Sequence, residues 1–107
     1  MGNPDEVFNS LIFKGKYEGF TDFYDVNKRE IYMSIIKIFE EFEKTKKNSL
    51  ILHVNAEIRG VEWDTEFLFQ RDESIILVRD VIPYFEENEE YEICQGIKKI
   101  HESLTNV

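Results

Sequence analysis

The fold is decided by the stretch at residues 50–69, which reads LILHVNAEIRGVEWDTEFLF. Apolar and mostly polar side chains alternate along it, and a period of two is typical of a β-strand with one face buried and the other in water. Arg59-Gly60 interrupts the alternation at a point where a two-residue turn fits. The stretch therefore predicts a β-hairpin whose apolar residues share one face.

A third strand is expected at Ser74–Ile82, and Pro83 ends it because proline has no amide hydrogen to donate. Two-residue turns between the strands fix the register in which they pair. In that register Glu66 lies opposite Arg79, an attractive cross-strand pair. Arg59 is a poor residue for the primed turn of such a hairpin, so a β-bulge in the first hairpin is the alternative.

Helices are expected before and after these strands. The clearest one runs from Asn27, a capping residue, to Asn48. Its apolar stripe consists of Ile31, Ile35, Ile38, Phe39 and Phe42. A second helix is expected at about 87–104. A short helix is expected to begin at Asn3, with an apolar face made of Val7, Phe8, Leu11 and Ile12. Residues 16–26 show no clear period and are expected to form a loop rich in aromatic residues.

Together these elements predict an α+β fold in the order α-α-β-β-β-α, a three-stranded antiparallel meander with helices packed on one face. At 107 residues the chain has the common size of one domain. We therefore expect a single domain over 1–107, with an N-terminal helix and aromatic loop at 3–26 and an α-β-β-β-α core at 27–104.

In outline, this core resembles the double-stranded-RNA-binding domain and half of a type III secretion chaperone. The first resemblance implies a basic helix start that grips phosphate, but residues 86–90 read Glu-Glu-Asn-Glu-Glu instead. The second resemblance implies a small, acidic, dimeric protein. Likeness of fold does not by itself imply function.

The formal net charge is −9. This charge opposes the phosphate backbone and argues against binding of nucleic acid, whereas it suits a basic protein partner or simply keeps the protein in solution. No stretch approaches the roughly 18 apolar residues of a membrane helix, so no membrane partner is expected. The single cysteine, Cys94, cannot form an internal disulfide, and the cytoplasm is the expected compartment.

The polar face of the expected sheet carries a row made of His53, Glu66 and Arg79. A histidine in such a row can titrate near neutral pH and can hold an anion or act as a weak acid or base. The row is also typical of a solvated sheet face, where opposite charges pair across strands, and no nucleophile accompanies it.

Glu57, Glu62 and Asp64 form an acidic cluster near the first hairpin. Like charges that face each other across strands are mildly destabilising, so a positive group is expected to relieve them. The candidates are Arg59, a basic partner or a hard cation, although strands do not supply the oxygen cage of a calcium site.

Ile51, Leu68 and Leu77 form an apolar strip on the same, otherwise polar, face. An apolar strip on a face that meets water implies a cover. Three covers are open: the aromatic segment at residues 8–24, a second copy of the chain, or a partner protein.

The sequence holds no nucleotide-binding, metal-binding or catalytic signature, so no cofactor and no catalytic residue is expected. Our leading hypothesis is a non-enzymatic, acidic protein-binding module of the immunity, inhibitor or chaperone-like kind. It uses the apolar strip together with the polar residues of the outer sheet face. The alternatives are a homodimeric structural or assembly protein and, less favoured, a small enzyme centred on His53, Glu66 and Arg79.

Overall fold

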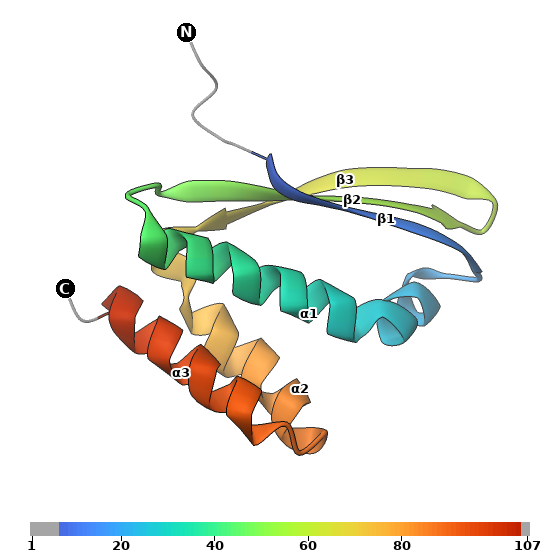
Figure 1. Ribbon diagram of the computed structural model, residues 1–107. Helices are drawn as coiled ribbons and strands as arrows, with labels where there is room; N and C mark the ends of the chain where they lie inside the picture. Colours follow the sequence, from blue (N-terminus) through green and yellow to red (C-terminus); the bar gives the residue numbers. More distant parts are fainter. Residues whose placement is uncertain (1–6, 106–107) are drawn as a thin grey trace, which may run out of the picture. The chain divides into compact units, whose positions relative to one another are not determined.

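The computed structural model describes residues 7–105. Along the chain it has β1 (Val7–Tyr17), α1 (Phe20–Lys44), β2 (Ser49–Ile58), β3 (Val61–Gln70), the short helical segments η1 (Arg71–Glu73) and η2 (Leu77–Val81), α2 (Ile82–Glu87) and α3 (Tyr91–Thr105) (Figure 1). The strands form one mixed sheet in the order β1-β2-β3, in which β1 runs parallel to β2 and β2 and β3 form a hairpin. The predicted α+β class is therefore confirmed, whereas the purely antiparallel meander is wrong.

The described residues group into two compact units. The sheet unit comprises residues 7–34 and 49–69, and the helical unit comprises residues 35–48 and 70–105. The first part of α1 belongs to the sheet unit and its second part to the helical unit. The single domain expected over the whole chain stays a prediction.

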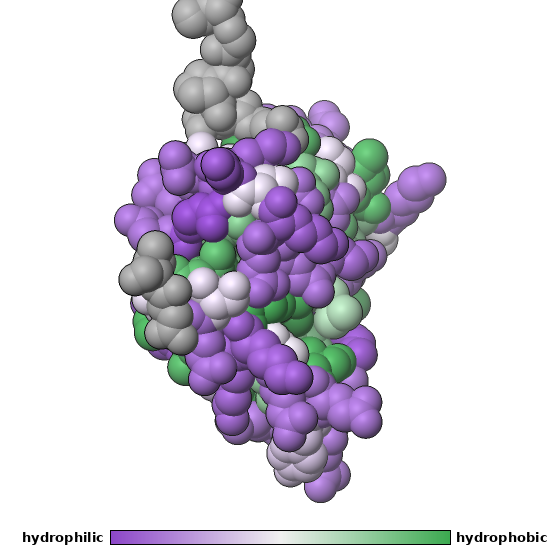
Figure 2. Space-filling view, turned by 60° about the vertical axis from the view of Figure 1, so that its left-hand side comes forward, coloured by the Kyte–Doolittle hydropathy of each residue, from purple (hydrophilic) through white to green (hydrophobic). Residues whose placement is uncertain are grey.

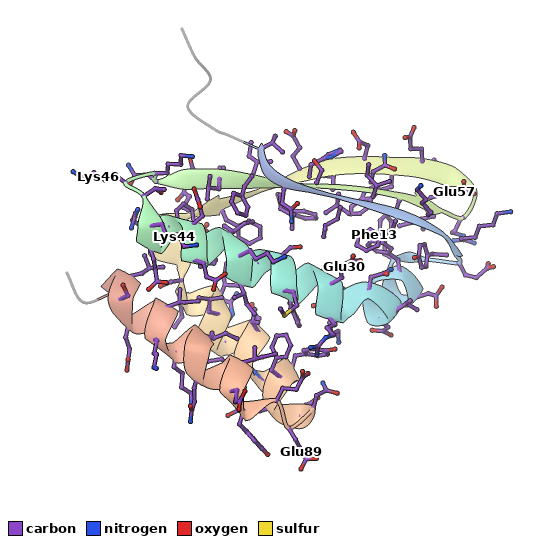
Figure 3. The ribbon with its side chains drawn as sticks, viewed as in Figure 1. Phe13, Glu30, Lys44, Lys46, Glu57 and Glu89 are labelled. Carbon is purple, nitrogen blue, oxygen red and sulfur yellow. The ribbon has the colours of Figure 1, made fainter. Side chains whose placement is uncertain are left out.

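The core of the sheet unit lies on one face of β2. Every second residue of that strand is buried, as the alternation predicted: Leu50, Leu52, Val54, Ala56 and Ile58. β1 adds Phe13, which points toward α1 (Figure 3). α1 adds Phe23, and the rings of Phe13 and Phe23 meet edge to face at a centroid distance of 5.1 Å. Burying a side chain of this size contributes about 1.5–3 kcal/mol to stability. Phe13 and Phe23 therefore fix β1 and the start of α1 on the inner face of the sheet.

The turn between β2 and β3 consists of Arg59 and Gly60 alone. Both residues have positive φ, 55° for Arg59 and 77° for Gly60, as a primed hairpin turn requires. The predicted two-residue turn is confirmed, and the β-bulge considered as its alternative is wrong. Arg59 is held in this conformation from outside the hairpin, because its amide donates a hydrogen bond of 2.8 Å to the carbonyl of Tyr17 at the end of β1.

The short N-terminal helix is wrong where the structure describes it, because residues 7–17 form β1; its start at Asn3 lies outside the described residues. The apolar spacing of this segment fits one face of a helix, but a helix this short is marginal without support. As a strand it satisfies the backbone groups of β2 on the side away from β3. The aromatic loop expected at 16–26 is likewise replaced by the start of α1 at Phe20.

The third strand expected at Ser74–Ile82 is also wrong, because this segment is helical. Its buried side chains follow a helical spacing: Ser74, Leu77, Val81, Ile82 and Phe85. Pro83 stands in the first turn of α2, directly after the helical segment η2, so it does not end a strand. With the order β-α-β-β-α-α, the outline likeness to the double-stranded-RNA-binding domain and to the secretion chaperone does not hold.

Within the helical unit, the predicted C-terminal helix is confirmed as α3. Its buried stripe is Cys94, Ile97 and Ile100. The Arg71 guanidinium holds the chain after α1, because it donates to the carbonyl of Lys47 at 3.0 Å and to that of Thr45. Both carbonyls follow Lys44, the last residue of α1.

Candidate functional site

The outer face of the sheet, which lies opposite the core, carries most of the residues that the sequence singled out. Pairing with β1 places Ser10 beside His53, Ile12 beside Asn55 and Lys16 beside Glu57. The two-residue turn extends the rows into β3, with Glu66 beside His53, Asp64 beside Asn55 and Glu62 beside Glu57. A backbone hydrogen bond of 2.9 Å from Arg71 N to Asn48 O keeps this register beyond the ends of both strands.

His53 lies at the centre of a hydrogen-bonded line across all three strands. Its Nε2 is 2.5 Å from Asp64 Oδ1 on β3, and its Nδ1 is 3.3 Å from Ser10 Oγ on β1. A serine, a histidine and an aspartate in line are the groups that activate a serine nucleophile in hydrolases. The same polar line can hold a hydrogen-bonding group of a bound protein. Ser10 was missed by the sequence analysis, since it reaches His53 only through pairing between residues 43 positions apart.

The predicted row of His53, Glu66 and Arg79 is wrong at one position. Arg79 lies on η2 in the helical unit, where its guanidinium pairs with Asp80 at 2.7 Å. This pair raises the pKa of Arg79 and lowers that of Asp80. Glu66 remains on the outer face beside His53, but Asp64 is the carboxylate that His53 contacts.

Asn55 relieves the like charges of the acidic cluster. Its Nδ2 donates to Glu62 Oε2 and to Asp64 Oδ1, each at 3.0 Å. The bonds from Asn55 and His53, in that order of importance, hold the pKa of Asp64 below its ordinary value. Asp64 is thus ionised at neutral pH, and side chains of the same face, Asn55 and His53, supply its hydrogen-bond partners.

The apolar strip exists with a different third member. Leu77 is fully buried on η2, so its predicted place in the strip is wrong. Val7 takes this place, because β1 pairs it with Ile51, and the hairpin register puts Leu68 on the other side of Ile51. Val7 and Leu68 are each 48% exposed. We call Val7, Ile51 and Leu68 the apolar row. Residues 8–24 do not cover it, since they form β1 and the start of α1, and Phe23 lies on the inner face.

An aromatic margin, also missed by the sequence analysis, lies on the inner side of β3. It consists of Phe20, Val61, Trp63 and Phe67. The Trp63 ring meets that of Phe20 at 4.9 Å and that of Phe67 at 6.3 Å. Phe20, Val61 and Phe67 are all exposed. The alternation of β3 would have predicted this margin only if β3 had been recognised as the last strand of the sheet.

Other sites receive little support from the structure. Among residues 7–105, no three side chains of His, Cys, Asp or Glu lie together in a way that would hold a metal ion. Cys94 is buried in the helical unit, and this burial is the main cause that raises the pKa of its thiol. A thiol of raised pKa is a weak nucleophile at neutral pH. No helix in the described part of the chain is both long enough and apolar enough to cross a membrane.

Comparisons with models of protein families, with curated proteins and with solved structures found no match for this chain. Function is therefore inferred from the outer face of the sheet. That face combines an acidic cluster, a hydrogen-bonded line and an exposed apolar row. Figure 2 shows the molecule from another side, where hydrophilic side chains dominate the surface.

Proposed function

We propose that this chain is a non-enzymatic protein-binding module, of the immunity, inhibitor or chaperone-like kind, that holds a basic protein segment against the outer face of its sheet. One observation carries the proposal: the apolar row lies on the same open face as the carboxylates of Glu57, Glu62, Asp64 and Glu66. Such a face suits a ligand with both apolar and positively charged side chains.

The two kinds of residue supply different parts of the binding. Burial of the apolar row removes hydrocarbon surface from water and contributes affinity. The carboxylates, together with the net charge of −9, attract basic partners over a distance and repel acidic ones, nucleic acid included. We place the module in the cytoplasm, in keeping with a single, buried thiol and no disulfide.

A defined peptide tests this function. The probe is a ten-residue peptide of alternating lysine and valine, and its control is the matching peptide of glutamate and valine. Trp63 is the single tryptophan of the chain and lies on β3, so its fluorescence reports binding. We expect saturable binding of the Lys-Val peptide, weakened by salt, and none of the Glu-Val peptide.

Leu68→Glu is the matched disruption of the apolar row. We expect it to weaken binding of the Lys-Val peptide by about tenfold, since an interface side chain of this kind contributes on the order of 1 kcal/mol or more. Ile75→Glu is the control, because Ile75 is equally exposed but lies in the helical unit. An equal loss of peptide binding in the two variants would show that the outer face is not the binding surface.

The alternative proposal, a homodimeric structural or assembly protein, uses the apolar row against a second copy of the chain. Two copies that met through this face would bring their acidic clusters close together. Sedimentation equilibrium separates the alternatives: a monomer at high concentration removes the dimer, and a dimer that Leu68→Glu dissociates supports it.

The line of Ser10, His53 and Asp64 favours a second candidate function, hydrolysis of an ester. In that chemistry the Ser10 hydroxyl attacks the acyl carbon and His53 takes its proton. His53 then gives the proton to the alcohol that leaves as the ester bond breaks, and water hydrolyses the acyl-serine. One observation weighs against this function: the amide of Ser10, a donor that could stabilise an oxyanion, already donates to Asn9 Oδ1 at 3.0 Å. Turnover of p-nitrophenyl acetate that Ser10→Ala abolishes would support the enzyme, and equal turnover by both proteins would remove it.

A further inference from the structure

The free edge of β3 is the feature from which a binding mode follows. β3 spans Val61–Gln70 and is the last strand of the sheet, and no further strand pairs with it in the part of the chain that the structure describes (Figure 1). In a hairpin with a two-residue turn, alternate residues direct both backbone groups toward the partner strand. The other residues direct theirs to the free edge, and in β3 these are Glu62, Asp64, Glu66, Leu68 and Gln70.

Gln70 confirms this alternation and marks where the free edge ends. Its amide faces away from β2 and donates to Glu73 Oε1 at 2.8 Å. The next amide, that of Arg71, faces the other way and donates to Asn48 O. The open part of the edge is therefore the stretch from Glu62 to Leu68.

Exposed apolar side chains flank this edge on both faces. On the inner side Val61 is 67% and Phe67 is 43% exposed, and Phe20 and Trp63 extend the same surface. On the outer side lies Leu68 of the apolar row. A strand added at this edge would gain backbone hydrogen bonds and would bury apolar surface on both faces of the sheet.

The negative charge of β3 determines which kind of strand can pair with its free edge. Glu62, Asp64 and Glu66 stand at every second position on the outer side, while their neighbours on the inner side are Val61, Trp63, Thr65 and Phe67. A second copy of β3 would bring three more carboxylates to the same side, and like charges across strands destabilise the pairing. A basic strand places opposite charges there instead.

We propose that β3 accepts an extended segment of a basic partner protein as a fourth strand of the sheet. Lysine or arginine at alternate positions of that segment lies along Glu62, Asp64 and Glu66, and its apolar residues pack on the aromatic margin. This inference rests on the proposed function and specifies its binding mode.

Two isomers of the Lys-Val peptide test the mode. One carries N-methyl groups on its central lysines and the other on its central valines. Methylation removes amide hydrogens from only one edge of an extended strand. An antiparallel fourth strand directs the lysine amides toward β3, whereas a parallel one directs the valine amides there. We expect one isomer to bind like the parent peptide and the other at least about tenfold more weakly, through the loss of several backbone bonds.

Equal binding by the two isomers, whether tight or weak, overturns the fourth strand and leaves the outer-face function standing if the parent peptide binds. Failure of the parent peptide overturns both proposals.

Amide hydrogen exchange locates the added strand on the full chain. We expect the amides of Glu62, Asp64, Glu66 and Leu68 to exchange fast in the free protein and to slow at least about tenfold with the Lys-Val peptide bound. Protection that appears on β1 instead overturns the proposal. So does protection of β3 in the free protein that rises with protein concentration, which would assign the edge to a second copy.

Discussion

β1 and β3 are both edge strands of the same sheet, but their free edges differ. The pairing of β1 with β2 is irregular at two places, between Val7 and Asn9 and between Ile12 and Lys16, and β1 carries two lysines. β3 runs for ten residues without proline, glycine or lysine. Bulges and lysines are the devices by which natural sheets discourage further pairing. Within residues 7–105 these devices protect the edge of β1, whereas the edge of β3 is open and carries acids that exclude unsuitable strands.

The difference also concerns what holds each strand. β1 is fixed through its inner face, where Phe13 meets Phe23 and Asn9 donates to Ser34 Oγ at 3.4 Å. β3 is held by its hairpin with β2, by the buried Phe69 and by Trp63, whose ring meets those of Phe20 and Phe23. Its outer face and its free edge are the parts that it offers to a partner.

The largest expected effect comes from a pair of neighbours on β1. We expect Phe13→Ala to lower the free energy of unfolding by about 3–5 kcal/mol, because it leaves a cavity under the sheet. Ile12→Ala should change it by about 0.5 kcal/mol or less, since Ile12 is 64% exposed. Urea denaturation of both variants measures the difference. A larger loss of stability in Ile12→Ala than in Phe13→Ala would support the N-terminal helix predicted from the sequence, in which Ile12 belongs to the apolar face.

The next largest effect on stability distinguishes the two edges of β3, the one that pairs with β2 and the free one. Thr65→Pro removes an amide that faces β2, and we expect a loss of about 2–4 kcal/mol from the broken bond and the unpaired carbonyl. Glu66→Pro removes an amide that faces the free edge, so its loss of stability should be clearly smaller. Urea denaturation compares the two. Equal losses would contradict the register derived for the hairpin.

Glu66→Pro should also weaken binding of the Lys-Val peptide beyond the loss of one charge. Glu66→Gln is the control for that charge, because it keeps the amide. Similar affinities of the two variants for the Lys-Val peptide would show that the Glu66 amide does not contribute to binding.

A smaller effect tests whether the acids of β3 act locally. Glu66→Lys reverses one charge beside the free edge, and we expect about fivefold weaker binding of the Lys-Val peptide at low salt. Glu102→Lys changes the net charge equally from an exposed position on α3. Tryptophan fluorescence titrations of both variants give the comparison. The same loss in both would mean that net charge alone attracts the peptide.

The hairpin was predictable because its signals are local. The alternation of Leu50–Ile58 and the turn at Arg59-Gly60 lie in one short stretch, and they correctly predict the buried face of β2 and its register with β3. The parallel pairing of β1 joins Ser10 to His53 across 43 positions, and no local pattern reveals it. Residues 74–82 contain an apolar run that suits a strand or a buried helix, and tertiary packing decides for the helix.

The candidate site was predictable to the same extent. Seven of the predicted site residues owe their positions to the hairpin alone, and the structure places them on one face: His53, Glu57, Glu62, Asp64, Glu66, Ile51 and Leu68. Leu77 and Arg79 depended on the third strand and lie in the helical unit instead. Val7 and Ser10 complete the rows on the opposite side of the hairpin, because β1 pairs with β2, whereas the predicted third strand would have paired with β3.

The smallest expected effect concerns the hydrogen-bonded line of Ser10, His53 and Asp64, which connects the two edge strands β1 and β3. The hydrogen bonds from Asn55 and His53 hold the pKa of Asp64 below 3.8, so they favour the folded state when Asp64 is ionised. This contribution is fully present above pH 3.8 and is lost as the pH falls through the lower pKa of the folded protein. Asp64→Asn should therefore reduce the urea midpoint at pH 6, and the difference from the unmodified chain should shrink below pH 3.8.

Asp25→Asn removes a charge from an exposed position on α1 and serves as the control, with little expected change in the midpoint. A difference for Asp64→Asn that stays constant from pH 6 to pH 3 would show that its carboxylate is not stabilised by its neighbours. The polar line would then be a solvated surface, and β1 and β3 would be joined only through the backbone of β2.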